Sequence, residues 1–144
     1  MKKVSEAKIL VCFLTLLICA CNTSGPEPIN FGKDQCHYCK MTIADPNYGA
    51  ELITDKGRIF KYDATECMIN HIKDESPAYQ DIFAIAYNDP KQLYKVDSLY
   101  FIISPDFRSP MGANLAAFSK KKEIESKYEG QLLNWEQLVN HLSK

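Results

Sequence analysis

The densest group of metal-binding side chains in this 144-residue chain is the stretch Asp34-Gln35-Cys36-His37-Tyr38-Cys39-Lys40-Met41-Thr42-Ile43. Six consecutive positions supply two thiols, a thioether and an imidazole, and soft sulfur donors favour copper(I) among biological metals. An extended chain from Cys39 to Ile43 would put Cys39, Met41 and Ile43 on one face, so that Cys39 and Met41 converge. A redox dithiol, half of a zinc site, or a cysteine and a methionine that only pack are the alternatives.

The N-terminus predicts a lipoprotein signal peptide at residues 1–20. Lysines flank an apolar run at 9–20, which is too short to cross a bilayer and fits the hydrophobic core of a signal peptide. The run ends in Leu17-Ile18-Cys19-Ala20-Cys21, which resembles a bacterial lipobox, so we expect acyl chains such as palmitate on Cys21. A plain secreted protein cut nearby is the alternative.

Residues 21–33 are rich in Gly, Pro and polar side chains, and we expect them to form a flexible tether. The folded domain would then occupy residues 34–144. Asn22 beside the acylated cysteine favours the outer membrane. We therefore expect a lipid-anchored protein on the outer membrane or on another membrane surface that faces the periplasm.

The cysteine count changes meaning once the leader is removed. The folded part keeps only Cys36, Cys39 and Cys67. An odd number of thiols is a poor disulfide framework in an oxidising compartment. A bound metal would account for them.

Charge and motif content exclude several classes of function. The net charge is −1, and outside the N-terminus the one basic cluster is short, at 120–122, so a nucleic-acid partner has no electrostatic basis. The sequence contains no phosphate-binding glycine loop, and no third group accompanies a cysteine–histidine pair for nucleophilic catalysis. We therefore expect a protein that is not an enzyme.

Hydrophobic patterns and turn residues predict the secondary structure. Strands are expected at 50–54, 58–62, 82–87, 94–96, 100–103, 114–118 and 132–133. Helices are expected at 64–73, between 119 and 130, and at 134–142. The expected helix caps are Asp63 with Glu66 as a capping box, Ser119, and Asn134 with Gln137 as a second capping box.

A weak internal repeat suggests how these elements combine. Gly49-Ala50-Glu51-Leu52 and Gly112-Ala113-Asn114-Leu115 each open a strand that leads toward a helix. Two strand-strand-helix-strand units predict an α+β fold of two small ββαβ-like halves, with helices packed on mainly antiparallel sheet.

The residues alone leave two rivals to copper(I). Cys36 and Cys39 could form a redox pair, although no strand precedes them to set up a helix N-terminus. The same pair with Cys67 and His71, which lie four positions apart on one helix face, would complete a structural zinc site. Zinc leaves Met41 and the loop residue Met111 without a role, whereas copper(I) accepts both thioethers, and His37 is a further candidate ligand.

The motifs together resemble the NosL family, the lipoprotein accessory factors of nitrous oxide reductase, over residues 34–142. The matching segments are Cys36–Ile43, Gly49–Leu52, Phe60–Asp63, Ser109–Gly112 and Leu115–Phe118.

The resemblance implies a copper(I)-binding metallochaperone that delivers copper to an extracytoplasmic client, nitrous oxide reductase or its assembly factor. In this resemblance, Cys39 and Met41 match the family's Cys-x-Met motif, and Met111 matches its Pro-Met-Gly position. Cys36 and His37 are expected to complete the copper site, with Cys67 and His71 as further candidates. The alternatives are a periplasmic thiol-disulfide oxidoreductase that uses Cys36 and Cys39, and a structural zinc-binding lipoprotein.

Overall fold

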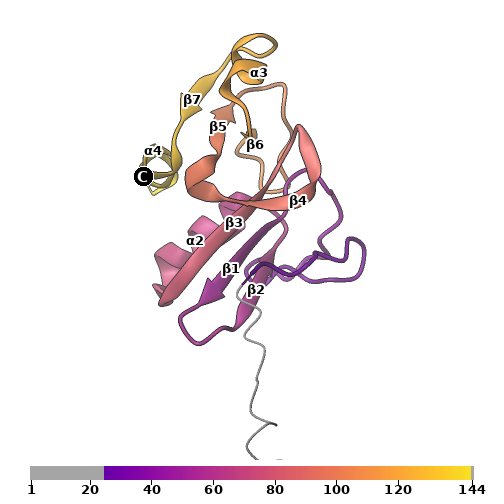
Figure 1. Ribbon diagram of the computed structural model, residues 1–144, viewed down its shortest axis with the longest axis vertical. Helices are drawn as coiled ribbons and strands as arrows, with labels where there is room; N and C mark the ends of the chain where they lie inside the picture. Colours follow the sequence, from indigo (N-terminus) through magenta and orange to yellow (C-terminus); the bar gives the residue numbers. More distant parts are fainter. Residues whose placement is uncertain (1–24, 144) are drawn as a thin grey trace, which may run out of the picture.

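Two antiparallel sheets organise residues 25–143, the part of the chain that the computed structural model describes (Figure 1). The strands are β1 (Ala50–Thr54), β2 (Ile59–Tyr62), β3 (Tyr79–Ala86), β4 (Asp89–Lys95), β5 (Tyr100–Ile103), β6 (Leu115–Phe118) and β7 (Gln131–Leu133). The helices are α2 (Thr65–Glu75), α3 (Lys121–Glu125) and α4 (Trp135–Leu142), with a 3-10 turn, η1 (Val96–Ser98). The predicted signal peptide and the acylated Cys21 lie outside the described residues.

The two sheets repeat one topology, which confirms the predicted α+β fold of two ββαβ-like halves. In the first half (residues 25–95) β1 pairs with both β2 and β3, and in the second half (residues 100–143) β5 pairs with both β6 and β7. Strand β4 extends the first sheet at the edge of β3. The repeated tetrapeptides do not mark equivalent positions, since 49–52 opens the central strand β1 whereas 112–115 opens the edge strand β6.

Strand β1 is buried on both faces because the segment before it returns to cover the sheet. The backbone N–H of Glu27 donates to the Glu51 carboxylate at 3.0 Å, and Ile29 is only 8% exposed. Gly49 makes room for this segment, since a Cβ there would lie 2.7 Å from Ile29 Cδ1. Part of the expected tether therefore packs against the domain, which begins before Asp34.

The helix caps agree with the sequence only in part. Asp63 is not the N-cap of α2: that position is Ala64, no side chain caps the helix, and Glu66 is buried instead of returning to the cap. Lys120, and not Ser119, precedes α3, because Ser119 hydrogen bonds with Asn88.

The predicted capping box of α4 is confirmed. Asn134 Oδ1 accepts from the Gln137 N–H at 2.8 Å, and Gln137 Oε1 accepts from the Asn134 N–H at 2.9 Å.

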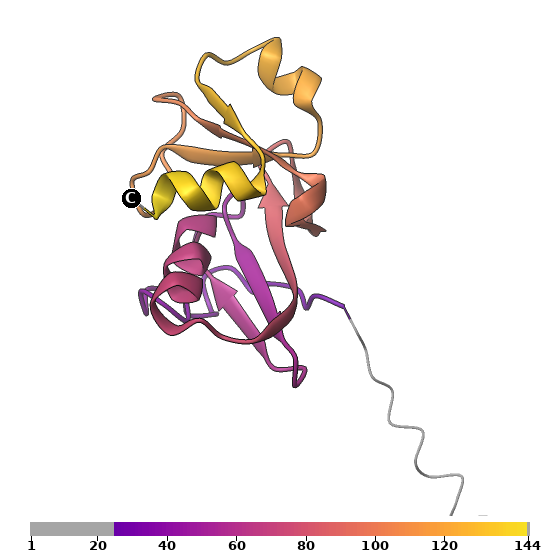
Figure 2. The same ribbon diagram turned by 90° about the vertical axis from the view of Figure 1, so that its left-hand side faces the viewer.

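Helix α4 joins the halves. It crosses the boundary between them and lies beside α2 (Figure 2). One core cluster contains residues of both halves, while a second gathers aromatic rings around Phe107 and Phe118. Within residues 25–143, none of the helices has the length and apolar character required to cross a membrane.

Candidate metal centre

A tight turn presents Cys36 and Cys39 from one side of the site. The Cys36 N–H donates to the Met41 carbonyl at 2.8 Å, and the Lys40 N–H donates to the Cys36 carbonyl at 3.1 Å. Lys40 closes the turn in the left-handed region, with φ of 64°. The His37 N–H donates to the Lys61 carbonyl of β2 at 2.8 Å, which fixes the turn to the edge of the first sheet.

This turn corrects one prediction. Cys39 is not extended: residues 37–39 form the turn, and the positive φ of Lys40 interrupts the alternation between Cys39 and Met41. Only Thr42, paired with Gln35, makes an isolated strand-like bridge here. Cys39 and Met41 therefore do not share a strand face in the way that the spacing suggested.

Helix α2 supplies the third thiol. Cys67 is the third residue of α2, so it lies at the positively polarised N-terminus of an eleven-residue helix. Its side chain is fully buried, as is that of Cys36, whereas Cys39 is partly exposed.

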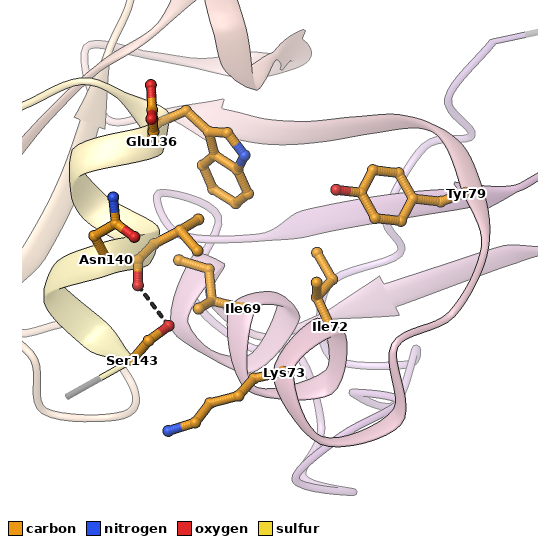
Figure 3. A pocket seen from close by; sticks show the side chains of 9 residues that line it. Ile69, Ile72, Lys73, Tyr79, Glu136, Asn140 and Ser143 are labelled. Atoms are coloured by element: carbon orange, nitrogen blue, oxygen red, sulfur yellow. Dashed lines mark hydrogen bonds between the residues drawn. The ribbon is translucent and has the colours of Figure 1, made fainter.

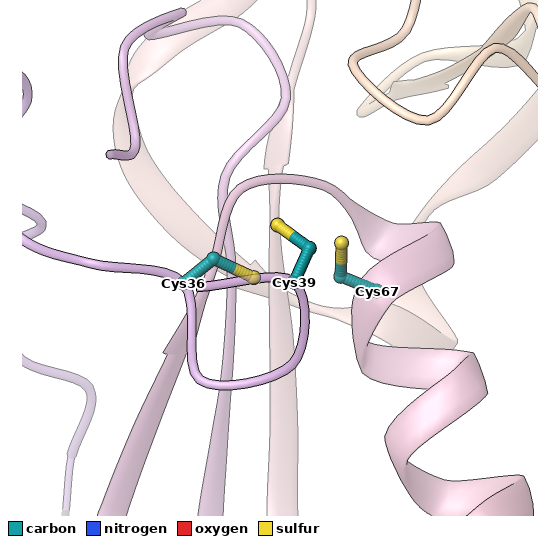
Figure 4. A group of neighbouring side chains, drawn as sticks. All are labelled: Cys36, Cys39 and Cys67. Atoms are coloured by element: carbon teal, nitrogen blue, oxygen red, sulfur yellow. The ribbon is translucent and has the colours of Figure 1, made fainter. Parts of the chain in front are cut away.

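The three sulfur atoms lie within 4.8 Å of one another, and all three cysteines are free (Figure 4). Around a metal with bonds of about 2.3 Å to sulfur, three trigonal ligands would lie about 4 Å apart. The sulfurs of Cys36, Cys39 and Cys67 would therefore need to move together by less than about 1 Å to hold one ion.

The three thiols share their protons unequally. A hydrogen bond from the Cys67 thiol, supported by the Asp63 N–H, lowers the pKa of Cys36 to about 5. The same interaction with Cys36, together with burial, raises the pKa of Cys67, and burial raises that of Cys39. The contact between Cys36 and Cys67 therefore favours a thiolate in the cluster, and thiols that are still protonated lose their protons when a metal binds.

The histidines of the sequence prediction belong to a separate group. His71 does not join Cys67: its ring lies with His37 and Glu75, with one ligand atom of each within 4.8 Å of the others. Sequence reasoning did not include Glu75, although its spacing of four from His71 on one helix was the available signal.

The predicted thioether ligands face solvent. Met41 is 53% exposed and Met111 is 40% exposed, in contrast to the buried Met68. The Met41 N–H donates to the Cys39 sulfur, so Met41 adjoins the thiol cluster through its backbone.

An apolar cleft lies elsewhere and offers no metal ligand of this kind. It has a volume of about 350 Å³ and separates α2 from α4, with Ile69, Ile72 and Lys73 facing Glu136, Asn140 and Ser143 (Figure 3). None of its nine lining residues is a cysteine, histidine or methionine. The cysteine cluster is therefore the better candidate for a functional centre.

Comparison with known proteins now identifies the fold and the lineage. The model of the NosL family matches residues 28–142. The chain belongs to the NosL family. This confirms the resemblance that the sequence motifs suggested.

Two relatives illustrate the family. The chain is 25% identical over 126 residues to the copper-binding lipoprotein NosL of Stutzerimonas stutzeri, covering 78% of this chain and 66% of that protein. It therefore spans slightly less than two thirds of the length of this relative. The crystal structure of the copper chaperone NosL from Shewanella denitrificans has the same fold, with a TM-score of 0.69, 18% identity, and coverage of 78% of this chain and 94% of that chain.

Proposed function

We propose that this protein is a lipid-anchored copper(I) metallochaperone whose metal centre is built on Cys36, Cys39 and Cys67. The observation that carries the proposal is the convergence of three free sulfurs from two separate elements within 4.8 Å. Soft thiolates in a low-coordinate arrangement are the ligands that copper(I) prefers. The chain is not an enzyme, since it belongs to a family of copper-binding and chaperone proteins.

The geometry supports copper over structural zinc. The closed zinc set required His71 beside the three cysteines, but His71 bonds Tyr62 and Glu75 and groups with His37. Three thiolates without a fourth protein ligand suit copper(I) better than a closed tetrahedral zinc site.

The geometry also argues against a thiol-disulfide oxidoreductase. Such an enzyme needs an accessible thiolate, usually at a helix N-terminus. Here the thiol with the lowered pKa, Cys36, is fully buried and lies in a turn. The exposed member of the pair, Cys39, has the raised pKa.

A chaperone must also release its ion, and we assign that step to the exposed side of the centre. Cys36 and Cys67 would hold copper from within, while the partly exposed Cys39 would be the first ligand that a partner replaces. Met41, next to Cys39, and Met111 offer exposed thioethers, and weak sulfur donors of this kind suit transfer better than tight storage. His37 would support the turn between the two cysteines.

The anchor and the client complete the proposal. Signal cleavage before Cys21 and its acylation would hold the domain at the outer membrane or another periplasm-facing surface through residues 21–26. The copper-receiving partner would be an extracytoplasmic protein, and the family resemblance points to nitrous oxide reductase or its assembly factor.

The decisive test is an anaerobic copper(I) titration in competition with a chromophoric chelator. We expect the wild type to bind one equivalent, and Cys67→Ser and Cys39→Ser to lose at least about a hundredfold in affinity because each removes a thiolate ligand. Met41→Leu should weaken binding less, and Met68→Leu, a buried thioether beside Cys67, serves as its matched control. Unchanged affinity in Cys67→Ser would contradict the three-cysteine centre.

A further inference from the structure

The turn that carries Cys36 and Cys39 has the backbone geometry that a disulfide requires. The Lys40 N–H donates to the Cys36 carbonyl at 3.1 Å, which closes residues 36–40 as a single helical turn. Cα atoms three positions apart in such a turn are separated by about 5 Å, and disulfides span about 4.4–6.8 Å between Cα atoms. The two sulfur atoms also lie within 4.8 Å of each other. A bond between them therefore requires movement of the side chains and little movement of the backbone.

The three thiols of the cluster differ in their access to a reagent from solvent. Cys39 is partly exposed, whereas Cys36 and Cys67 are fully buried (Figure 4). A disulfide oxidant therefore reaches the cluster first at Cys39. A mixed disulfide formed there would place an electrophilic sulfur beside two buried thiols.

Cys36 is the better partner for that mixed disulfide than Cys67. Cys36 belongs to the same turn as Cys39, whereas Cys67 is held in the first turn of α2, where its N–H donates to the Ala64 carbonyl at 3.1 Å. The Cys67 thiol also donates to the Cys36 sulfur, which favours Cys36 as the attacking thiolate. Connectivity and hydrogen bonding therefore select the same pair.

We propose that Cys36 and Cys39 form a reversible disulfide that switches the copper centre off, with a disulfide oxidant closing it and a dithiol reductant opening it. In the first step the Cys39 thiolate attacks the oxidant R–S–S–R, forms Cys39–S–S–R and releases R–S⁻. In the second step the Cys36 thiolate attacks the Cys39 sulfur and releases the second R–S⁻. The two cysteine thiols lose two electrons and two protons in total, and the oxidant becomes two molecules of R–SH.

The switch rests on the proposed function, because Cys36 and Cys39 are two of the three proposed copper ligands. The oxidised centre would retain only the Cys67 thiol, which is too few ligands to hold copper(I) tightly. Bound copper would in turn protect Cys39 from the oxidant. The reaction changes this chain's own centre and requires no protein substrate, since Cys36 is fully buried.

Peptide mapping tests which thiols pair. The reduced, copper-free lipoprotein in detergent is incubated anaerobically with oxidised glutathione, alkylated and digested with trypsin, which leaves Cys36 and Cys39 in peptide 34–40 and Cys67 in peptide 62–73. We expect peptide 34–40 to lose the mass of two hydrogen atoms and peptide 62–73 to be alkylated. Cys67→Ser is the matched control and should form the same disulfide, whereas Cys39→Ser should not.

Copper affinity of the two redox forms tests the consequence of the pairing. With a reductant for copper that leaves disulfides intact, the oxidised form should bind copper(I) at least about a hundredfold more weakly than the reduced form. A dithiol reductant should restore the affinity. Loading one equivalent of copper(I) before the glutathione treatment should slow disulfide formation at least about tenfold.

Three results would overturn the switch. They are a link between peptides 34–40 and 62–73, a mixed disulfide with glutathione or no disulfide as the final product, and equal copper affinity in the two redox forms. Failure of the reduced protein to bind copper(I) would instead contradict the proposed function. The two failures are distinguishable, because the peptide map is obtained without metal.

Discussion

The two halves of the molecule follow the same ββαβ path and differ in what they carry. The helix of the first half, α2, has eleven residues and supplies Cys67, His71 and Glu75. The equivalent helix of the second half, α3, has five residues, and its surface pairs Lys121 with Glu125. The repeated ββαβ topology therefore supplies a scaffold, and the candidate metal centre depends on the longer helix and the ligand side chains that only the first half adds to it.

The difference extends to the interior. Among the described residues, every buried carboxyl or imidazole side chain lies in the first half: Glu51, Asp63, Glu66 and His71. The buried polar side chains of the second half are the hydroxyls of Ser104 and Ser109. Instead, the second half is filled by aromatic rings, with Phe107, Phe118 and Tyr128 in mutual contact. We expect the second half to contribute stability and the first half to contribute metal chemistry and pH dependence.

The largest effect should come from breaking the aromatic cluster of the second half. Phe118 is 2% exposed and contacts Phe107 and Tyr128, so Phe118→Ala should lower the free energy of unfolding by about 3–5 kcal/mol through lost burial and a cavity. Urea denaturation of the apo protein would measure this. Copper(I) affinity of the folded protein should not change.

Phe60→Ala is the matched control in the first half. Phe60 is only partly buried, so the loss of stability should be smaller, but the stack under His37 disappears. Because His37 lies in the turn that carries Cys36 and Cys39, we expect Phe60→Ala to weaken copper(I) binding. An equal loss of copper(I) affinity in Phe118→Ala would contradict the division of roles between the two halves.

The division was visible in the sequence to a limited extent. Alternating and apolar segments predicted the strands, since local hydrophobic pattern and turn residues decide where strands form. The Asn134–Gln137 capping box was predicted because both partners are three residues apart. The Asp63–Glu66 pair has the same spacing but fails, because packing takes Glu66 into the interior.

The centre was harder to predict because it is assembled across distance. Cys36 and Cys39 are neighbours in the sequence, and Cys67 was predicted only as a further candidate ligand, grouped with them in the zinc alternative. No local pattern predicts that the first turn of α2 packs against the segment that carries Cys36 and Cys39. The left-handed backbone of Lys40 was also not predicted from the sequence. The predicted extended segment from Cys39 to Ile43 requires side chains that alternate without interruption, and Lys40 interrupts them. Packing between elements decided both points.

Buried charge should make the first half sensitive to pH. Burial raises the pKa of Glu51 from 4.5 to about 7. Between pH 4.5 and about 7, Glu51 is therefore protonated in the folded protein and ionised in the unfolded chain. The stability from this group is complete below about pH 4.5 and is lost as pH rises through 7. Glu51→Gln stays neutral, so from pH 4 to 8 the wild type should lose roughly 3 kcal/mol relative to this variant.

Unfolding free energies of both proteins at several pH values would measure this difference. The exposed Glu136→Gln serves as the control and should run parallel to the wild type. Parallel curves for Glu51→Gln and the wild type would show that Glu51 does not hold its proton.

A smaller effect compares one hydroxyl in each half. Tyr62→Phe removes the hydrogen bond between the Tyr62 hydroxyl and His71 Nδ1 and leaves that nitrogen buried, which should cost about 1–2 kcal/mol of unfolding free energy. Tyr100→Phe in β5 changes a side chain that is 39% exposed and should cost almost nothing. Chemical denaturation of the two variants side by side would test this, and equal losses would contradict the special position of Tyr62.

The smallest expected effect tests whether α4 couples the halves. Asn134→Ala removes the cap of α4 and should lower the free energy of unfolding by about 1 kcal/mol, while Asn140→Ala on the exposed surface of the same helix is its control. Because α4 belongs to the second half but packs beside α2, the loss should shift one cooperative transition. Trp135, the single tryptophan, reports on α4 by fluorescence, and far-ultraviolet circular dichroism reports on the whole chain. Coincident shifts in both signals would mean that the second half, with its aromatic core, also stabilises the first half, which carries the metal ligands. A shift confined to tryptophan fluorescence would mean that the two halves unfold separately.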